Sequence, residues 1–324
     1  MNHATLYILA LLAAALATAS TLPWWRRWCV RHDVMDDPGH RKIHSTPTPL
    51  AGGPAVMTGL LAALLGGTAF VFLQSSAGAM APFQYGLGKR AIQLFGITAG
   101  AFGMLLTGLR DDKADLGSAA KFSFQLLAAL VVAATGVRVT LFVPNILFSY
   151  FITVLWILTV VNAFNFMDNM NGLCAGLGVI GAAAFGLVAA QSGQYLVATM
   201  AFIISGALLG FLPYNFPKAR AFLGDSGSHL VGYLLAVLGI LPHFYTPTHR
   251  RMLAVLTPLI ILAVPLGDLA WVVVLRLRAG KPFYIGDTNH LSHRLVRRGL
   301  TTRQAVVVIW LISAGLGAIA CFWQ

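Results

Sequence analysis

The sequence predicts an all-α protein, a polytopic integral membrane bundle of about ten transmembrane helices. Hydrophobic residues make up 58% of the 324 residues and charged residues only 10%, whereas charged residues make up about 25% of an average soluble domain. Apolar runs of about 20 residues, the length needed to cross the hydrocarbon core, recur along the chain. No repeat, low-complexity tract or soluble segment interrupts them, so residues 1–324 are predicted to form one domain.

Each apolar run is predicted to be one span, in chain order 4–22, 51–74, 90–109, 119–136, 147–166, 174–191, 195–212, 227–243, 252–275 and 304–322. The first run has the position of a signal peptide, but no Lys or Arg precedes it and its charges follow in WWRRWCVRHD. This pattern predicts a retained helix that enters the membrane from outside.

The charged residues predict the orientation of the bundle. If the loops alternate sides, 17 of the 22 Lys and Arg residues lie inside, and five lie outside: Lys89, Arg90, Arg138, Arg250 and Arg251. Both termini are then predicted to face the outside. All ten acidic residues are Asp, and all fall on internal loops or internal helix ends, so a functional site is predicted on the cytoplasmic face.

The net charge of +12 is explained by orientation and by attraction to anionic membrane lipid. Nucleic-acid binding is poorly supported, because the basic residues are spread over short loops without a recognisable binding module. Cys29, Cys174 and Cys321 lie on different elements without metal-ligand spacing, which argues against a disulfide or a zinc site.

Two internal loops carry groups suited to phosphate chemistry. In DDPGHRKIHSTPTPLAGG (36–53), Arg41, Lys42 and His44 offer donors for phosphate oxygens, although a solvated basic loop is an equally good interpretation. In GLRDDKADLGSAAKFSFQ (108–125), Asp111 and Asp112 are adjacent carboxylates suited to metal ligation or proton acceptance. Lys121 and Gln125 lie four apart, on one helix face, and are predicted to hold a substrate phosphate.

The stretch VVNAFNFMDNMNG (160–172) places amides and a carboxylate at the end of an apolar run. Asn162, Asn165, Asp168 and Asn169 recur at intervals of three and four, so they are predicted to share one helix face. Amides both donate and accept, which suits recognition of a base edge, a sugar or a phosphate. Interhelical hydrogen bonding is the alternative, but it needs fewer residues.

Two further internal segments complete the set. In AFLGDSGSHLVGY (221–233), Asp225 stands at a predicted helix start with Ser226 and Ser228, suited to holding a cation against a phosphate. In GDTNHLSHRL (286–295), His290 and His293 lie between Asp287 and Arg294. A zinc pair would lack an obvious third ligand.

Together these stretches, with PLGDLAWVVVLRL, resemble in order the polyprenyl-phosphate N-acetylhexosamine-1-phosphate transferases, membrane enzymes that start bacterial cell-envelope glycans and include the lipid I translocase. The resemblance covers nearly the whole chain. It implies transfer of a sugar 1-phosphate from a UDP-N-acetylhexosamine to undecaprenyl phosphate with release of UMP, and a requirement for Mg²⁺ or, in its place, Mn²⁺. It also implies a multi-pass protein of the bacterial inner (cytoplasmic) membrane with both termini periplasmic, and a homodimer is compatible with it.

The resemblance also implies residue roles. Asp225 matches a magnesium-binding Asp, with Asp168 in the metal and nucleotide site beside Asn162 and Asn165. Phe222 matches an aromatic residue that stacks on uracil. Three further residues match catalytic or phosphate positions and one matches the leading histidine of a histidine motif: Asp111, Asp112, Lys121 and His290.

The chain departs from the family pattern at three positions. Asn169 replaces a Gly, Asn171 replaces a second Asp, and Ser292 stands where many relatives have another His. The lipid I translocase carries a run of consecutive histidines that this chain lacks, so UDP-N-acetylglucosamine is predicted as donor in preference to the muramyl-pentapeptide donor. A transporter of an anionic substrate is the alternative from another class, because polar residues in spans often mark a transport path.

Overall fold

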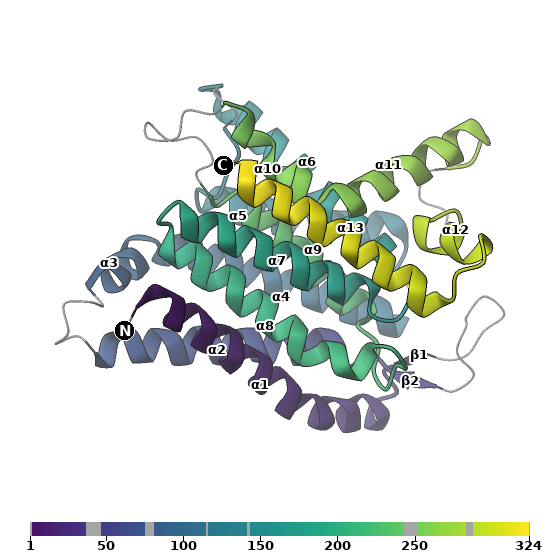
Figure 1. Ribbon diagram of the computed structural model, residues 1–324, viewed down its shortest axis with the longest axis horizontal. Helices are drawn as coiled ribbons and strands as arrows, with labels where there is room; N and C mark the ends of the chain where they lie inside the picture. Colours follow the sequence, from purple (N-terminus) through teal and green to yellow (C-terminus); the bar gives the residue numbers. More distant parts are fainter. Residues whose placement is uncertain are drawn as a thin grey trace.

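The computed structural model describes residues 2–36, 47–74, 81–114, 116–140, 143–242, 252–282 and 288–323. The described chain is mostly helical (Figure 1). A two-stranded antiparallel ladder pairs β1 (Met35–Asp36) with β2 (Thr48–Pro49), and a 3₁₀ turn, η2, covers Met252–Leu256. The helices are α1 His3–Arg31, α2 Gly52–Leu73, α3 Ala81–Lys89, α4 Ala91–Ala114, α5 Ser118–Ala134, α6 Ile146–Met167, α7 Leu173–Gln191, α8 Tyr195–Asn215, α9 Gly224–Leu238, α10 Thr257–Ile261, α11 Ala263–Arg278, α12 Leu291–Arg297 and α13 Thr302–Trp323.

Each of the ten predicted spans contains a helix, which confirms a polytopic helix bundle. Among the described helices seven are individually long and apolar enough to cross a membrane: α1, α2, α4, α6, α7, α8 and α13. Residues 254–278 supply an eighth span if the two helices that meet there, bent by 70°, are counted as one. Helices α5 and α9 have 17 and 15 residues, shorter than the roughly 20 that cross the hydrocarbon, so the count of ten stays a prediction.

Helix α9 is the buried centre of the bundle. It packs against α4, α6, α2 and α7, and Asp225, in its first turn, is its only residue that is not buried. Glycines let neighbouring backbones approach it: a Cβ on Gly108 of α4 would lie 2.2 Å from the Ser226 backbone, and one on Gly232 would lie 2.7 Å from Val161 Cα. The close packing fixes where α9 begins, and therefore where Asp225 stands.

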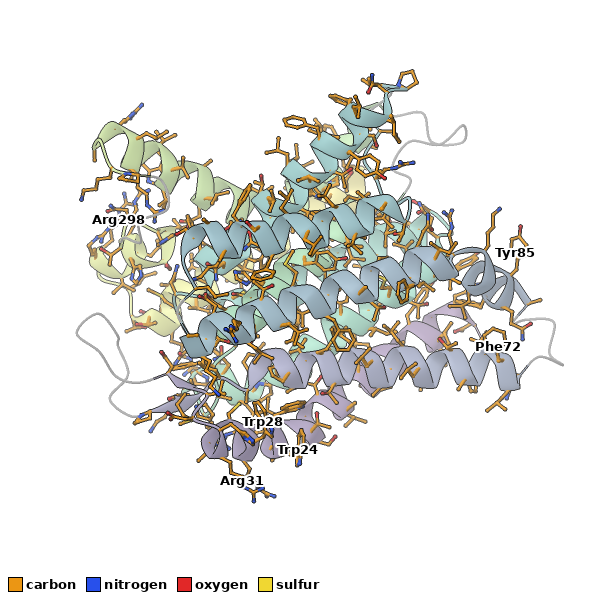
Figure 2. All side chains as sticks on the ribbon, turned by 180° about the vertical axis from the view of Figure 1, so that it is seen from behind. Trp24, Trp28, Arg31, Phe72, Tyr85 and Arg298 are labelled. Carbon is orange, nitrogen blue, oxygen red and sulfur yellow. The ribbon has the colours of Figure 1, made fainter. Side chains whose placement is uncertain are left out.

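The two ends of the bundle differ in chemistry. Both chain termini lie at one end in Figure 1, and the β1–β2 ladder and α12 lie at the other. Figure 2 places Trp24, Trp28, Arg31 and Arg298 toward the second end and Phe72 and Tyr85 toward the first. Tryptophans beside arginines are typical of a membrane–water interface, so the second end has the character of an interface rich in positive charge.

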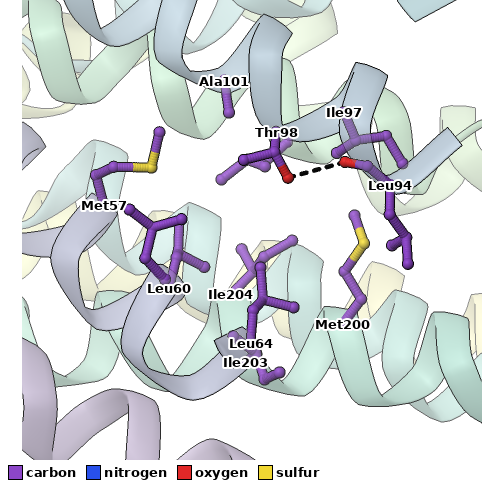
Figure 3. Close-up of a pocket in the computed structure, with 12 residues that line it drawn as sticks. Met57, Leu60, Leu64, Leu94, Ile97, Thr98, Ala101, Met200, Ile203 and Ile204 are labelled. Atoms are coloured by element: carbon purple, nitrogen blue, oxygen red, sulfur yellow. Dashed lines mark hydrogen bonds between the residues drawn. The ribbon is translucent and has the colours of Figure 1, made fainter. Parts of the chain in front are cut away.

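Two cavities found among the described residues are not lined by any predicted site residue. A small apolar cavity of about 30 Å³ lies between α2, α4 and α8 (Figure 3), where the Thr98 hydroxyl donates to the Leu94 carbonyl 2.8 Å away. A larger, mainly apolar cavity of about 610 Å³ is lined by residues from the terminus-bearing end, including Arg90, Arg138 and Tyr195. The polar residues that the sequence singles out lie elsewhere.

Three short features of the described chain were not expected from the sequence: α3, the β1–β2 pair, and the seven-residue helix α12 between the last two predicted spans. The nine-residue helix α3 is too short and too polar to register as a span. The β1–β2 pair lies in the loop between the first two helices, where the prolines and glycines predict irregular structure.

Candidate active site

Three charged side chains from three helices meet where α4 ends and α5 and α9 begin. Lys121 of α5 forms an ion pair with Asp111 of α4, and its Nζ lies 3.4 Å from Oδ2 of Asp225. The Asp111 side chain is only 3% exposed, whereas those of Lys121 and Asp225 are 29% and 32% exposed. One carboxylate is therefore sealed behind the ammonium group, and the other opens to the surface beside it.

Asp112 binds backbone N–H groups, whereas its neighbour Asp111 binds the Lys121 ammonium group. Its Oδ1 accepts a hydrogen bond from the backbone N–H of Asp225 at 2.8 Å, and its Oδ2 accepts one from the N–H of Ser226 at 3.1 Å. Gly224 makes room for this contact, because a Cβ there would lie 2.7 Å from Asp112 Oδ2 and its φ is +73°. Asp112 thus caps the positive N-terminal end of α9 and holds the backbone that carries Asp225.

Asn165, from the last turn of α6, completes the cluster. Its Nδ2 donates to Asp225 Oδ1 at 2.9 Å and to the Ser228 hydroxyl at 3.0 Å. Both oxygens of Asp225 therefore have partners, one on α5 and one on α6. Four of the predicted residues, Asp111, Lys121, Asn165 and Asp225, are brought together as the sequence predicts.

Asn162 is placed behind this cluster, one turn deeper. Its Nδ2 donates to Gln125 Oε1 at 3.0 Å and to the Leu158 carbonyl at 2.8 Å. Gln125 in turn lies 3.3 Å from Nε2 of the buried His229. These contacts connect α5, α6 and α9, the helices that carry Lys121, Asn165 and Asp225, so the Asn162 amide helps to hold those helices together.

Asp168 and Asn169 lie beyond the end of α6, which stops at Met167, so the expected single helix face does not extend to them. Burial raises the pKa of the Asp168 carboxyl well above its usual range, and the negative charges of Asp225, Asp112 and Asp36 raise it further. Carboxylates that crowd in this way favour a bound cation. The same crowding therefore marks this end of α6 as electrostatically suited to a metal.

His290 is oriented by Asp268, a residue for which the sequence analysis predicts no role. The ring Nδ1 lies 2.7 Å from Asp268 Oδ2, and the backbone N–H of Leu291 donates to Oδ1 at 2.6 Å. Both side chains are buried. Because Asp268 holds Nδ1, Nε2 is the ring nitrogen left for a substrate. An Asp deep in an apolar span is the sequence signal that points to such a role.

Phe166 links His290 to the carboxylate cluster. Its ring meets the His290 ring edge-on, with centroids 5.4 Å apart, and the Arg276 guanidinium lies 4.9 Å from its centre. Phe166 directly follows Asn165, which binds Asp225. The histidine therefore lies against the same turn of α6 that carries Asn165, the partner of Asp225.

The remaining predicted residues have varied positions. Phe222 is anchored by its backbone, since its N–H donates to the Pro49 carbonyl at 2.9 Å and its carbonyl accepts from the Gly52 N–H at 2.9 Å. Arg294 stacks on Trp271 at 4.8 Å, and the His293 ring lies 6.2 Å from that of His290. Three predicted phosphate-binding residues lie outside the described residues: Arg41, Lys42 and His44.

The donor set of the cluster fits a hard cation. Within the described ranges no three His, Cys or Asp side chains converge as a metal-ligand group. Mg²⁺, however, commonly uses one or two carboxylates and completes its shell with waters and substrate phosphates. Asp225 and Asp168 offer two carboxylates, and the Lys121 ammonium already lies between Asp111 and Asp225, where positive charge is favoured.

Comparison with known protein families gives one match, to the model described as glycosyl transferase family 4, over residues 94–243. That range contains α4, α5, α6 and α9, the helices that carry the cluster.

Similar proteins come from several bacteria. A probable undecaprenyl-phosphate N-acetylglucosaminyl 1-phosphate transferase of Bacillus subtilis is 31% identical over 94% of this chain and 82% of its own length. A decaprenyl-phosphate N-acetylglucosaminephosphotransferase of Mycobacterium tuberculosis is 35% identical over 94% of this chain and 79% of its own. An undecaprenyl-phosphate alpha-N-acetylglucosaminyl 1-phosphate transferase of Escherichia coli is 27% identical over 95% and 82%.

Proposed function

Because the chain belongs to glycosyl transferase family 4, we propose that it transfers N-acetylglucosamine 1-phosphate from UDP-N-acetylglucosamine to undecaprenyl phosphate and releases UMP. The relatives are named for transfer of this sugar phosphate to undecaprenyl or decaprenyl phosphate. The observation that carries the proposal is the convergence of Asp111, Lys121, Asn165 and Asp225 from four helices at one end of the bundle.

In this reaction an oxygen of the lipid phosphate attacks the phosphorus that bears the sugar. The bond from that phosphorus to the bridging oxygen breaks, and UMP leaves with that oxygen. The product is a sugar joined to the lipid through a diphosphate. Attacking group and donor are both anionic, so the site must concentrate positive charge and fix geometry.

Asp225, Asp168 and the Asn165 amide oxygen would hold Mg²⁺, or Mn²⁺ in its place. When bound, the cation would neutralise the diphosphate and stabilise the charge that develops on the departing UMP. Oxygen donors without a thiolate suit such a hard cation. Support comes from the crowding that raises the pKa of Asp168 and from the direct contact between Asn165 and Asp225.

The other residues act on the phosphates or on one another. Lys121, held at the surface by Asp111 and Asp225, would bind diphosphate oxygens. Asp112 is a positioning residue, because both its oxygens hold the start of α9. His290, fixed by Asp268, would hydrogen-bond a phosphate through Nε2.

The membrane arrangement is part of the proposal. Ten spans in the bacterial inner membrane, both termini in the periplasm and a cytoplasmic site would let the soluble nucleotide and the lipid phosphate meet at the bilayer surface. The division of basic residues between the loops supports this orientation, and the two termini lie together in Figure 1, opposite the ladder and α12. A homodimer stays a prediction from the sequence.

The test is UMP release by the purified protein in detergent or in vesicles that contain undecaprenyl phosphate and Mg²⁺. UDP-N-acetylglucosamine and UDP-muramyl-pentapeptide are compared on the same sample, each with and without the acceptor lipid. We expect acceptor-dependent release with UDP-N-acetylglucosamine. Efficient use of the pentapeptide donor alone would contradict the donor assignment, and no release with any UDP-sugar would contradict the transferase itself.

A further inference from the structure

Residues 288–297 form a short arm that carries His290, packs apolar side chains on the bundle, and makes two side-chain hydrogen-bond contacts that concern His290 directly. The first is that of Asp268 on α11, which binds the His290 ring and the Leu291 N–H. The second is Ser292, whose hydroxyl donates to Asn169 Oδ1 at 2.7 Å. Ser292 is fully buried, at 0% exposure, so its hydroxyl has no water to replace this partner.

Asn169 connects the arm to the end of α6. While its Oδ1 accepts from Ser292, its Nδ2 donates to the Phe166 carbonyl at 2.7 Å. Phe166 in turn touches the His290 ring edge-on at 5.4 Å. These contacts close a ring: His290 leads along the chain to Ser292, then through Asn169 and Phe166 back to the His290 imidazole.

We propose that Ser292 is a positioning residue, whose hydrogen bond to Asn169 fixes the His290 imidazole relative to the carboxylate cluster. The polar and stacking contacts of the arm to α11 are those of Asp268 with His290 and Leu291 and that of Arg294 with Trp271. The Ser292–Asn169 hydrogen bond adds a polar contact to the end of α6, directly next to Asp168. The arm is therefore fixed to α6 as well as to α11. The kinetic side of this inference rests on the proposed function.

The experiment combines three variants, Ser292→Ala, Asn169→Ala and the double variant, with a matched control. Ser205→Ala is that control, because Ser205 is also a buried serine with one hydrogen bond, to the Val179 carbonyl, but lies on α8. For Ser292→Ala we expect turnover to fall about 10- to 100-fold, the cost of a displaced reacting group. We expect the KM for UDP-N-acetylglucosamine to stay within about twofold, because the Ser292–Asn169 hydrogen bond does not involve Lys121, Asn165 or Asp225.

The double variant separates positioning from general damage. If Ser292 acts through Asn169, the double variant is no slower than Asn169→Ala, because the shared contact is already lost. Losses that multiply, or turnover within about twofold of wild type in Ser292→Ala, would overturn the proposal. Ser205→Ala should keep wild-type turnover, and an equal loss there would also overturn it.

Amide hydrogen exchange gives a readout that needs no substrate. Ser292→Ala and Asn169→Ala should both speed exchange at the backbone N–H groups of residues 291–297, while Ser205→Ala should not. Unchanged exchange in this segment would overturn the anchoring role. If the wild-type protein shows no transfer with any donor, the proposed function fails, and the exchange measurement still decides whether the Ser292–Asn169 contact holds the arm.

Discussion

Asp225→Asn should leave the protein folded and remove most of its Mg²⁺-dependent turnover. The substitution keeps the size of the side chain and one oxygen for Asn165, but it removes the negative charge that faces Lys121 and the proposed cation. The lost ion pair spans 3.4 Å between side chains that are 29% and 32% exposed. A partly exposed pair of this kind contributes at most about 1 kcal/mol to the free energy of unfolding.

The loss of stability should be smaller than that limit. The charge of Asp225 also repels Asp168 and raises its pKa, so removing the charge relieves part of the crowding. Turnover is different, because electrostatic groups that stabilise the transition state commonly contribute about 100- to 1000-fold, or about 2.7–4 kcal/mol. A large loss of rate with a small loss of stability is therefore the expected signature.

The assay measures UMP release across a range of Mg²⁺ concentrations, together with thermal unfolding of the purified protein. Asp33→Asn is the matched control: Asp33 is exposed near the end of α1, and its φ of +56° is tolerated by Asn. The control should keep wild-type turnover. A wild-type rate in Asp225→Asn at limiting Mg²⁺ would remove Asp225 from the metal site and refute the reasoning.

Three further predictions follow from the same cluster and its orientation. The apparent KM for Mg²⁺ should rise as pH falls, because the raised pKa of Asp168 lets protons compete with the cation at a higher pH than at an ordinary carboxyl. A KM independent of pH would argue against Asp168 as a ligand. Asn171→Asp should keep turnover within about threefold, since among the described residues the Asn171 amide makes one long hydrogen bond, 3.4 Å to the Pro217 carbonyl. A loss as large as that of Asp225→Asn would contradict this. The native Cys29 is buried, so new cysteines are introduced into a cysteine-free background. In intact cells, an impermeant thiol reagent should label Tyr85→Cys but not Arg31→Cys. The reverse pattern would overturn the orientation.

The sequence predicted the helices well because the apolar runs are long and the bilayer demands their length. Every predicted span contains a helix, and several limits agree within two residues, as for 147–166 against Ile146–Met167. The bend of 70° between residues 254–261 and 263–278 was not predicted, because packing against neighbouring helices decides such an angle. The nine residues of α3 and the two-residue strands carry too little periodic signal.

The members of the site were easier to predict than their partners. Asp111, Lys121, Asn165 and Asp225 stood out because polar groups at the ends of apolar helices need a reason to be there. Which group binds which is set by the fold: adjacent Asp111 and Asp112 have separate tasks, one holding Lys121 and the other capping α9. Linear spacing does not contain that division.

Asn162 and Asp268 are two further residues whose contacts could not be predicted from spacing in the sequence. Asn162 stays a predicted substrate-binding residue, but the sequence did not predict that its Nδ2 donates to Gln125 and Leu158 within the bundle. The sequence analysis assigned no role to Asp268, yet this residue orients His290. The contacts of Asn162 with Gln125 and of Asp268 with His290 join residues 37 and 22 positions apart, and only packing reveals them.

The most direct test of the central claim is mass spectrometry of the lipid made by the purified protein from UDP-N-acetylglucosamine, undecaprenyl phosphate and Mg²⁺. The account predicts undecaprenyl diphosphate N-acetylglucosamine, formed in step with UMP by the wild type and by Asp33→Asn, and nearly absent with Asp225→Asn. Consumption of the nucleotide sugar without this lipid, or equal yields of it from Asp225→Asn and wild type, would contradict the account.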